Sequence, residues 1–375
     1  MRQLYLAATG QNRGKTTAAL GLLNGFIQRD LRTGFLKPVG QRTVIEDGQP
    51  ADEDAVLMRE TFRLPEPYPM MSPVHIPRGF TRAFINGEVV EDLPARIHAA
   101  HRSYFEHDVL LIEGTGHAGV GAVIDLSNAV VARMLRAPAI IISEGGIGRP
   151  IDEIVLNAAL FAAHGVPVAG AIVNKVDADA RAGLARTLAR GLARHGIRLL
   201  GTLPRRPILS NPTLEMILEG VRGDMIHPGP SLDLVIGGVA IAAMESRHLL
   251  QHIRPGGLVI VPGDREDLIE AIARAHRSEA AGGQASAGRT AIGLVMTGGW
   301  IPRQAVLDEV RRADLFAVLV ADDTYSVASN VHDLLVKTHA ADREKIELIK
   351  ALVADHLDID RVLEVAVEAT EVAAG

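Results

Sequence analysis

The feature that most constrains the fold is a short segment near the N-terminus, Thr9–Thr17, with the sequence TGQNRGKTT. Its GKT matches the end of the phosphate-binding loop pattern G-x-x-x-x-G-K-[ST]. The pattern has a glycine where this chain has Thr9, and Gly10 follows one position later. Because a β-branched residue tolerates positive φ poorly, we expect Thr9 to keep an extended backbone and Gly10 to supply the flexible turn.

The flanks of this segment favour a loop between a strand and a helix. An apolar run precedes it at Leu4–Ala8, and apolar residues recur at helical spacing between Thr16 and Ile27. Backbone N–H groups of such a loop surround phosphate oxygens, which predicts a site for a nucleoside triphosphate with Mg²⁺. We expect Lys15 to bridge the β- and γ-phosphates and the Thr16 hydroxyl to bind the metal. The residues expected to bind the nucleotide in this loop are Thr9, Gly10, Gln11, Asn12, Arg13, Gly14, Lys15, Thr16 and Thr17.

Strand-like apolar runs alternate with helical segments through residues 1–208, which we take as the first domain. After the loop, the expected strands are Gly34–Val39, Val109–Ile112, Ala139–Ser143, Val168–Val173 and Arg198–Thr202. The expected helices between them are Leu126–Leu135, Ile151–His164 and Ala178–His195. This alternation predicts an α/β fold with a parallel sheet and helices on both faces, as in P-loop NTPases.

The pattern restarts in residues 209–338, which we take as a second, smaller α/β domain. Its expected strands are Leu232–Ala240, Leu258–Pro262, Ala291–Met296 and Phe316–Val320, with helices at Leu214–Glu219 and Arg265–His276. The small and polar residues of Ser278–Arg289 predict a surface loop. Residues 339–375 form a tail with helical periodicity at Asp342–Val367, which we expect to pack on a domain or on a partner subunit.

Polar residues at the ends of the predicted strands suggest a site next to the loop. Glu113 ends a buried strand, where a carboxylate can bind Mg²⁺, and Lys37 ends another, where it can face the phosphates. Either side chain could instead be a solvated strand end. The cluster Asp52–Asp54 fits the metal site or a helix N-terminus, where acidic residues favour the dipole. Asn174 begins an N-K-x-D segment compatible with contact to adenine or guanine.

Composition and charge narrow the classes of function. The chain has no cysteine, which excludes disulfides, thiolate nucleophiles, Cys-bound zinc and iron–sulfur clusters. A net charge of −6 gives no electrostatic reason to expect nucleic-acid binding. The apolar runs are far shorter than the roughly 18 residues of a membrane span, and the N-terminus lacks the pattern of a signal peptide. We therefore expect a cytoplasmic protein with no nucleic-acid or membrane partner.

Several motifs in the first domain occur in the order found in a known family. They are TGQNRGKTT, Lys37-Pro38-Val39, Asp52-x-Asp54, Glu113-Gly114-Thr115-Gly116 and Val173-Asn174-Lys175. Together they resemble dethiobiotin synthetase and its relatives, most closely the N-terminal region of long phosphotransacetylases. The resemblance implies ATP and Mg²⁺ as cofactors, with Lys15 and Lys37 stabilising the transferring phosphoryl group. It also implies that Thr16, Asp54 and Glu113 hold the metal.

The second domain resembles a DRTGG domain. The resemblance is carried by Pro262-Gly263-Asp264-Arg265-x-Asp267, Thr297-Gly298-Gly299 and Asp322-Asp323-Thr324-Tyr325. It implies a regulatory or dimer-forming role, so these loops either bind a ligand or only shape and dimerise the domain. The candidates for a second site are Arg42, Asp264, Arg265, Thr297, Gly298 and Gly299.

Two hypotheses for the function share ATP binding and differ in whether ATP is turned over. The first is a nucleotide-responsive regulatory module that dimerises through its DRTGG domain, acts on a metabolic-enzyme partner and hydrolyses ATP slowly or not at all. The alternative is an ATP-dependent ligase that phosphorylates a carboxylate or carbamate, as dethiobiotin synthetase does. Gly40-Gln41-Arg42 departs from that enzyme, and an arginine there suits an anionic ligand. The chain ends where long phosphotransacetylases continue into a catalytic domain, so we expect no phosphate acetyltransferase activity.

Overall fold

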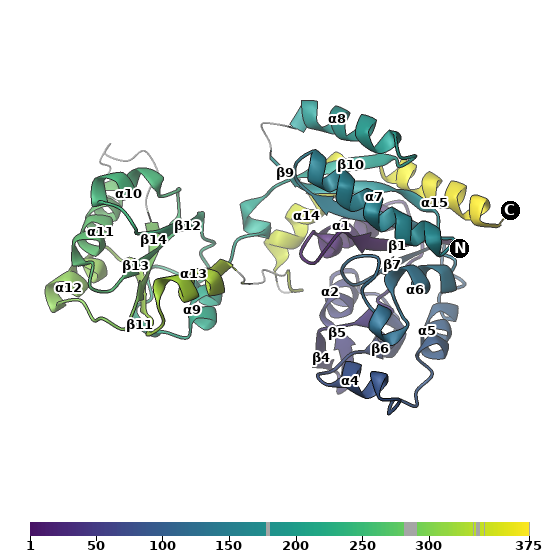
Figure 1. The fold of residues 1–375 in the computed structure, drawn as a ribbon, viewed down its shortest axis with the longest axis horizontal. Coiled ribbons are helices and arrows are strands. Elements are labelled where there is room, and N and C mark those ends of the chain that lie inside the picture. The colour runs from purple at the N-terminus through teal and green to yellow at the C-terminus, as the bar shows by residue number, and fades with distance from the viewer. Residues whose placement is uncertain (178–180, 281–290, 333, 335–337, 341, 375) are drawn as a thin grey trace. The chain divides into compact units, whose positions relative to one another are not determined.

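A computed structural model describes residues 1–177, 181–280, 291–332, 334, 338–340 and 342–374. The chain forms two compact units (Figure 1). The first unit contains residues 1–205 and 338–375, and the second contains residues 206–337. The second unit is therefore inserted into the sequence of the first, and the C-terminal segment returns to the first unit.

The first unit is built on a six-stranded sheet in the order β10-β9-β8-β1-β7-β2. Every neighbouring pair in it is parallel. Its strands are β1 (Arg2–Ala8), β2 (Thr33–Leu36), β7 (Val109–Glu113), β8 (Ala139–Glu144), β9 (Val168–Val176) and β10 (Leu199–Pro204). Two short pairs lie beside it: β3 (Val39–Gly40) with β6 (Val74–His75), and β4 (Thr43–Glu46) with β5 (Gln49–Asp52).

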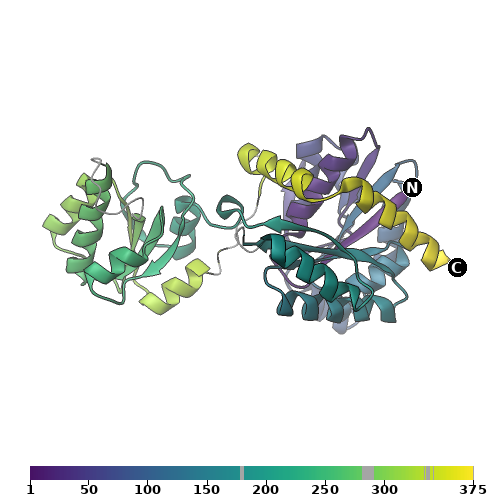
Figure 2. The same cartoon turned by 90° about the horizontal axis from the view of Figure 1, so that it is seen from above.

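Helices cover both faces of this sheet, so β7 is buried throughout and β8 is buried up to its last residue. Figure 2 shows the C-terminal helices on one side and α7 and α8 on the other. The helices are α1 (Lys15–Ile27), α2 (Glu53–Phe62), α3 (Tyr68–Met71), α4 (Phe80–Ile85), α5 (Leu93–Arg102), α6 (Asn128–Met134), α7 (Gly148–Ala163), α8 (Arg181–Ala193), α14 (Arg343–His356) and α15 (Ile359–Ala374), with 3₁₀ turns at Ala122–Ile124 and Pro207–Leu209. The predicted parallel sheet with helices on both faces is confirmed.

The C-terminal helices are part of the core of the first unit. A Cβ on Gly21 of α1 would lie 2.2 Å from Val353 of α14, and a Cβ on Gly25 would lie 2.8 Å from Ile359 of α15. At the end of α1, Arg29 binds Asp360 through two hydrogen bonds of 2.6 and 2.9 Å. The predicted helical tail therefore packs on the first unit, and the two glycines of α1 permit the close approach.

The second unit contains a five-stranded sheet in the order β11-β15-β14-β13-β12, in which β11 is antiparallel and the others are parallel. Its strands are β11 (Asp224–His227), β12 (Gly238–Ile241), β13 (Gly257–Pro262), β14 (Ala291–Thr297) and β15 (Phe316–Leu319). Its helices are α9 (Leu214–Val221), α10 (Ser246–His252), α11 (Glu266–Ala280), α12 (Gln304–Arg312) and α13 (Thr324–His332).

The strand predicted at Leu232–Ala240 begins only at Gly238, so the first part of that prediction is wrong. The carbonyls of Leu232 and Leu234 accept hydrogen bonds from the backbone of the α9 start, which holds this stretch outside the sheet. The predicted loop at Ser278–Arg289 lies outside the described residues from position 281 onward, and its first residues end α11. None of the helices among the described residues is both long and apolar enough to cross a lipid bilayer.

Candidate functional site

The segment TGQNRGKTT forms the loop between β1 and α1, and the helix begins at Lys15. Two residues of the loop have positive φ, Asn12 at 56° and Gly14 at 92°. Thr9 does not have positive φ, which confirms the expectation for that residue. Gly10, which we expected to supply the flexible turn, does not have positive φ; asparagine tolerates that conformation and adopts it at position 12.

Gly14 is required by space as well as by conformation. A Cβ at this position would lie 1.9 Å from Nδ2 of Asn174, a separation that no pair of non-bonded atoms tolerates. The last residue of the loop before α1 therefore packs directly against a side chain from the end of β9. This contact ties the loop to the sheet.

Four predicted site residues meet at the start of α1. Thr16 Oγ1 lies 3.1 Å from Oδ1 of Asp54 and 3.2 Å from Oε1 of Glu113. Lys37, just after β2, donates to Asp54 Oδ2 at 2.5 Å and to Glu113 Oε1 at 3.1 Å. We call these four residues the Lys37 cluster. It joins a hydroxyl, an ammonium group and two carboxylates from four separate elements.

The acidic segment Asp52–Asp54 at the start of α2 has two roles. Asp52 caps α2, because its side chain accepts a hydrogen bond of 3.0 Å from the backbone N–H of Asp54. Asp54 itself faces Lys37 and Thr16. The sequence left the helix N-terminus and the metal site as alternatives for this segment. In the structure, Asp52 caps the helix and Asp54 belongs to the Lys37 cluster.

Burial sets the protonation of the cluster. Lys37 is 3% exposed, and burial alone would lower its pKa, but the carboxylates of Asp54 and Glu113 outweigh burial and hold the pKa of Lys37 well above its usual value. Glu113 is fully buried, and burial raises the pKa of its carboxyl to about 7 despite the nearby Lys37 ammonium. A charged lysine between two carboxyl groups is costly to bury, and one of these groups has a pKa of about 7. Such an arrangement is typical of a functional site.

The donor set of the cluster fits Mg²⁺, which prefers oxygen ligands and commonly uses one or two carboxylates together with phosphate oxygens. Glu113 Oε2 is buried and has no hydrogen-bond partner among the described residues, so it is an available oxygen. Within the same residues, no group of three or more His, Asp or Glu could hold a metal unaided. Thr16, Asp54 and Glu113 therefore suit a metal that arrives with a nucleotide.

Side chains from β8 and α7 bind the outer side of the loop, and among them Glu153 is one that the sequence analysis did not single out. Glu153 of α7 accepts hydrogen bonds from Thr9 Oγ1 at 2.8 Å and from Arg149 at 2.7 Å. Glu144, the last residue of β8, forms an ion pair with Arg13. The i, i+4 spacing of Arg149 and Glu153 was visible in the sequence, but its proximity to the loop depends on the fold.

Asn174 lies at the end of β9, as predicted, and is 5% exposed. Its Nδ2 donates to the backbone oxygen of Arg13 at 3.1 Å, so the side chain contacts the loop. Contact with a nucleotide base stays a prediction. Arg42 is half-buried between β3 and β4, where its backbone N–H lies 3.4 Å from Asp52 Oδ2.

The other candidates for a second site lie in the second unit, at the carboxyl ends of β13 and β14. Thr297 is buried, and its hydroxyl pairs with that of Thr324 at 2.7 Å. Gly298 and Gly299 have positive φ, and their N–H groups donate to the loop after β15. Arg265 forms two hydrogen bonds of 2.9 Å with Asp267, and Asp264 before it is exposed. These residues share one edge of the second sheet, whereas Arg42 belongs to the first unit.

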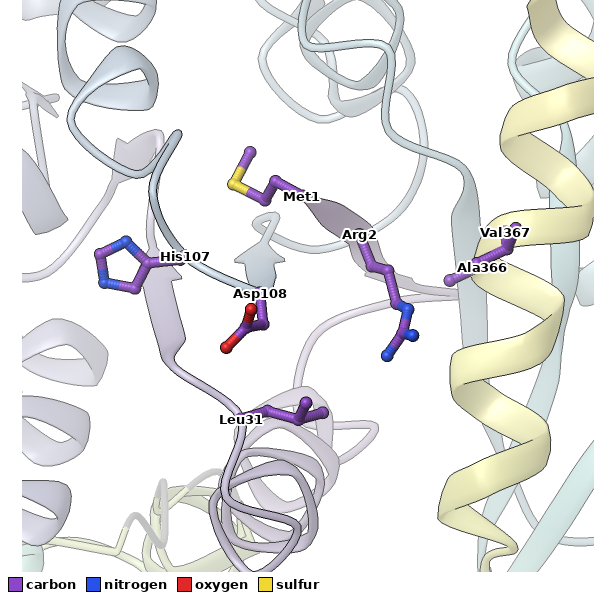
Figure 3. A pocket seen from close by; sticks show the side chains of 7 residues that line it. All are labelled: Met1, Arg2, Leu31, His107, Asp108, Ala366 and Val367. Atoms are coloured by element: carbon purple, nitrogen blue, oxygen red, sulfur yellow. The ribbon is translucent and has the colours of Figure 1, made fainter.

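A cavity of about 380 Å³ occurs elsewhere in the first unit (Figure 3). It lies where β1 and β7 begin, at the edge of the sheet opposite the phosphate loop. Its lining residues are Met1, Arg2, Leu31, His107, Asp108, Ala366 and Val367. None of the predicted site residues lines it.

Comparison with protein families gives two matches. A family described as AAA domain matches residues 2–213, and a family described as DRTGG domain matches residues 216–334. The first match includes the loop and the whole Lys37 cluster. The second begins after the chain has left the first sheet.

Curated relatives include proteins named phosphate acetyltransferase. Those of Pseudomonas aeruginosa and Pseudomonas putida are 27% and 28% identical over 380 and 377 residues, with 96% of this chain covered in each case. The match covers 51% of each relative, so this chain spans about half the length of the curated relatives it matches.

Solved structures give weaker likenesses. The CBS and DRTGG domains of the regulatory region of Clostridium perfringens pyrophosphatase, complexed with diadenosine tetraphosphate, are 16% identical with a TM-score of 0.29, covering 40% of this chain and 64% of that one. The signal recognition particle receptor of Elizabethkingia anophelis, in complex with GDP, is 15% identical with a TM-score of 0.36, covering 54% and 57%. Scores this low support no further conclusion.

Proposed function

Since this chain belongs to the AAA domain family through residues 2–213 and carries a DRTGG domain at residues 216–334, we propose that it is a Mg-ATP-binding regulatory module. The observation that carries the proposal is the Lys37 cluster at the start of α1. It gathers Thr16, Asp54 and Glu113 as oxygen ligands beside a loop with the backbone of an anion site.

In this proposal, donors and cations of the chain would bind the phosphates, and its oxygen ligands would bind the metal. The loop N–H groups and Lys15 would hold the phosphates, since both are donors at a helix N-terminus. Thr16, Asp54 and Glu113 would hold Mg²⁺, which supplies positive charge that offsets the phosphate oxygens. The raised pKa of Lys37 keeps that side chain cationic at the γ-phosphate side of the cluster. Adenine rather than guanine is part of the proposal.

The regulatory part of the proposal assigns the readout to the second unit. We propose that this unit forms a homodimer and responds to the nucleotide, with a metabolic enzyme as partner. The support is its DRTGG match, together with the large side chains exposed at its sheet edge, Trp300, Ile301 and Tyr325. The acetyl transfer named for the relatives is not part of the proposal, because the match covers half of their length.

A second candidate is an ATP-dependent ligase acting on a carboxylate or carbamate. It is favoured by Lys37, which lies between two carboxylates where it could stabilise a transferring phosphoryl group. Arg42, in the turn between β3 and β4, would then face an anionic acceptor.

Calorimetric titration with Mg-ATP tests the proposal. Lys15→Ala should weaken binding at least about tenfold, because it removes a cation at the phosphates, while Lys350→Ala on α14 is the matched control and should bind as the wild type does. Equal affinity in all three proteins would contradict the site. A screen of small acids and diamines then separates the candidates, since acceptor-dependent phosphate release supports the ligase and its absence supports the regulatory module.

Dimerisation is tested by replacing residues 206–337 with a short Gly-Ser linker, which keeps the C-terminal helices on α1. Cutting the chain after residue 210 would not serve, since it also removes α14 and α15 from the first unit. The linked protein should be a monomer by light scattering while the full chain is a dimer. A dimer that survives the replacement would place the interface in the first unit.

A further inference from the structure

Two consecutive residues at the end of β9 contact the back of the phosphate loop. Nδ2 of Asn174 donates to the backbone oxygen of Arg13 at 3.1 Å, and Nζ of Lys175 donates to the backbone oxygen of Asn12 at 2.7 Å. Consecutive carbonyls of the loop are therefore each held by a side-chain donor. Both donors come from one strand end.

The pair of donors is itself held in place. Oδ1 of Asn174 accepts the N–H of Lys175 at 2.8 Å, which fixes the orientation of the amide. Lys175 has a φ of 53°, a left-handed conformation that is strained for a lysine and so needs other contacts to maintain it. The Asn174 amide also fills the space beside Gly14 that a side chain would otherwise take.

Glu144, at the end of the neighbouring strand β8, connects this pair to the loop by charge. Its Oε2 lies 3.0 Å from Lys175 Nζ, and its Oε1 pairs with the Arg13 guanidinium. These two cations hold the pKa of Glu144 below its usual value although burial opposes this. Glu144 thus links the side chain of Arg13 to Lys175, and Lys175 in turn holds the backbone oxygen of Asn12.

The geometry of a trans peptide gives these contacts a consequence for ligand binding. The C=O and N–H of one peptide unit point in opposite directions. Holding the oxygens of Asn12 and Arg13 from behind therefore turns the N–H groups of Arg13 and Gly14 toward the opposite side of the loop. In a phosphate loop this is the side on which N–H groups surround the anion.

We propose that Asn174, Lys175 and Glu144 form a clamp that sets the backbone of the phosphate loop for binding. They are positioning residues, and they act on the phosphates through the loop rather than on the nucleotide base. The inference rests on the proposed nucleotide binding and deepens it. It assigns to Asn174 a role different from the base contact that its sequence context predicts.

Two ligands separate the clamp from a base contact, since Mg-tripolyphosphate has phosphates and no base. Both are titrated by calorimetry into the full chain, its variants Asn174→Ala and Lys175→Met, and the control Lys350→Met. The clamp predicts that each β9 variant loses about tenfold in affinity, by the same factor for Mg-ATP and Mg-tripolyphosphate, with the control unchanged. A loss confined to Mg-ATP would overturn the proposal in favour of a base contact.

Glu144→Gln keeps the shape of the side chain. It therefore tests the clamp even if one of the other variants fails to fold. It should bind both ligands several-fold more weakly at an unchanged melting temperature, because it weakens the hold on Arg13 and Lys175 together. Wild-type affinity in folded Lys175→Met and Glu144→Gln would overturn the clamp. Failure of the wild type to bind either ligand would instead contradict the proposed nucleotide site, so the two failures are distinct.

Discussion

The carboxyl ends of parallel strands carry glycine-containing loops in both units, and the two sets of loops are built differently. In the first unit, buried ionisable groups converge there, with Lys37 between Asp54 and Glu113. In the second unit, the buried Thr297 is paired with Thr324, and Arg265 pairs with Asp267 at the surface. Burying charge costs stability and surface pairing does not, so the comparison indicates that the site in the first unit is the more costly of the two to fold.

We call the carboxyl ends of the strands in the two sheets the first and second edges. The largest expected difference between these edges is in their contribution to stability. Lys37→Met removes a cation from between two buried carboxylates and should lower the free energy of unfolding of the first unit by about 3 kcal/mol or more. Arg265→Met at the second edge should cost less than about 1 kcal/mol. Urea unfolding followed by circular dichroism measures both, with the fluorescence of Trp300, the single tryptophan of the chain, identifying the second unit. Similar losses at the two edges would contradict the distinction.

The next difference is the sign of the pH dependence. Glu113 has a folded-state pKa of about 7, above its usual 4.5, so the folded chain binds this proton more tightly. Its contribution to stability is full below about pH 4.5 and is lost as pH rises toward 7, by up to about 3 kcal/mol. The pKa of Asp267 is lowered by Arg265, so its contribution is lost as pH falls. Unfolding at pH 5, 6 and 7 should show a decline that Glu113→Gln removes and Asp267→Asn does not.

A pair of glycine substitutions compares the edges as ligand sites. Gly14→Ala places a Cβ against Asn174 at a φ of 92°, and should lower the affinity for Mg-ATP at least about tenfold. Gly298→Ala meets similar strain at a φ of 82°, and should destabilise the second unit by about 1 kcal/mol without changing that affinity. Calorimetry and unfolding measure the two effects. A loss of affinity in Gly298→Ala would make the second edge part of the nucleotide site.

The smallest expected effect concerns Trp300, whose fluorescence tests whether Mg-ATP binding at the first edge changes the second edge. Trp300 is 65% exposed, so Trp300→Ala should change stability by no more than about 0.5 kcal/mol. In the wild type, its fluorescence reports on the second edge alone. The regulatory proposal expects Mg-ATP to change this emission and expects Lys15→Ala to abolish the change. Constant emission at saturating Mg-ATP would separate the second unit from nucleotide binding.

Much of the first site could be predicted from the sequence, because its residues lie at the ends of strands whose apolar runs are easy to recognise. Glu113 and Lys37 follow such runs, and parallel strands bring their carboxyl ends to one edge. The division of labour between Asp52 and Asp54 could not be predicted, since it depends on where α2 begins. The β4–β5 hairpin was missed because Gln49–Asp52 lacks the alternating apolar pattern of a strand.

Contacts between segments distant in the sequence were beyond prediction for a different reason. The positive φ of Asn12 is set by the loop as a whole, whereas the sequence pointed to Gly10 by residue type alone. Glu153 reaches Thr9 only because α7 packs on β8, which is the neighbour of β1 in the sheet. The helical period of residues 342–367 was clear, but the surface they would cover was not, because Gly21 and Gly25 carry no side chain to signal a partner.

Those two glycines also bear on the order of folding during synthesis. The face of α1 that contains them is covered by Val353 and Ile359, and the whole second unit lies between these segments in the chain. The ribosome must therefore make residues 206–337 before the helices that complete the first unit emerge. The first unit, although its strands are translated first, therefore cannot complete its core until residues 206–337 have been made, and until then α1 lacks the helices that cover its apolar face.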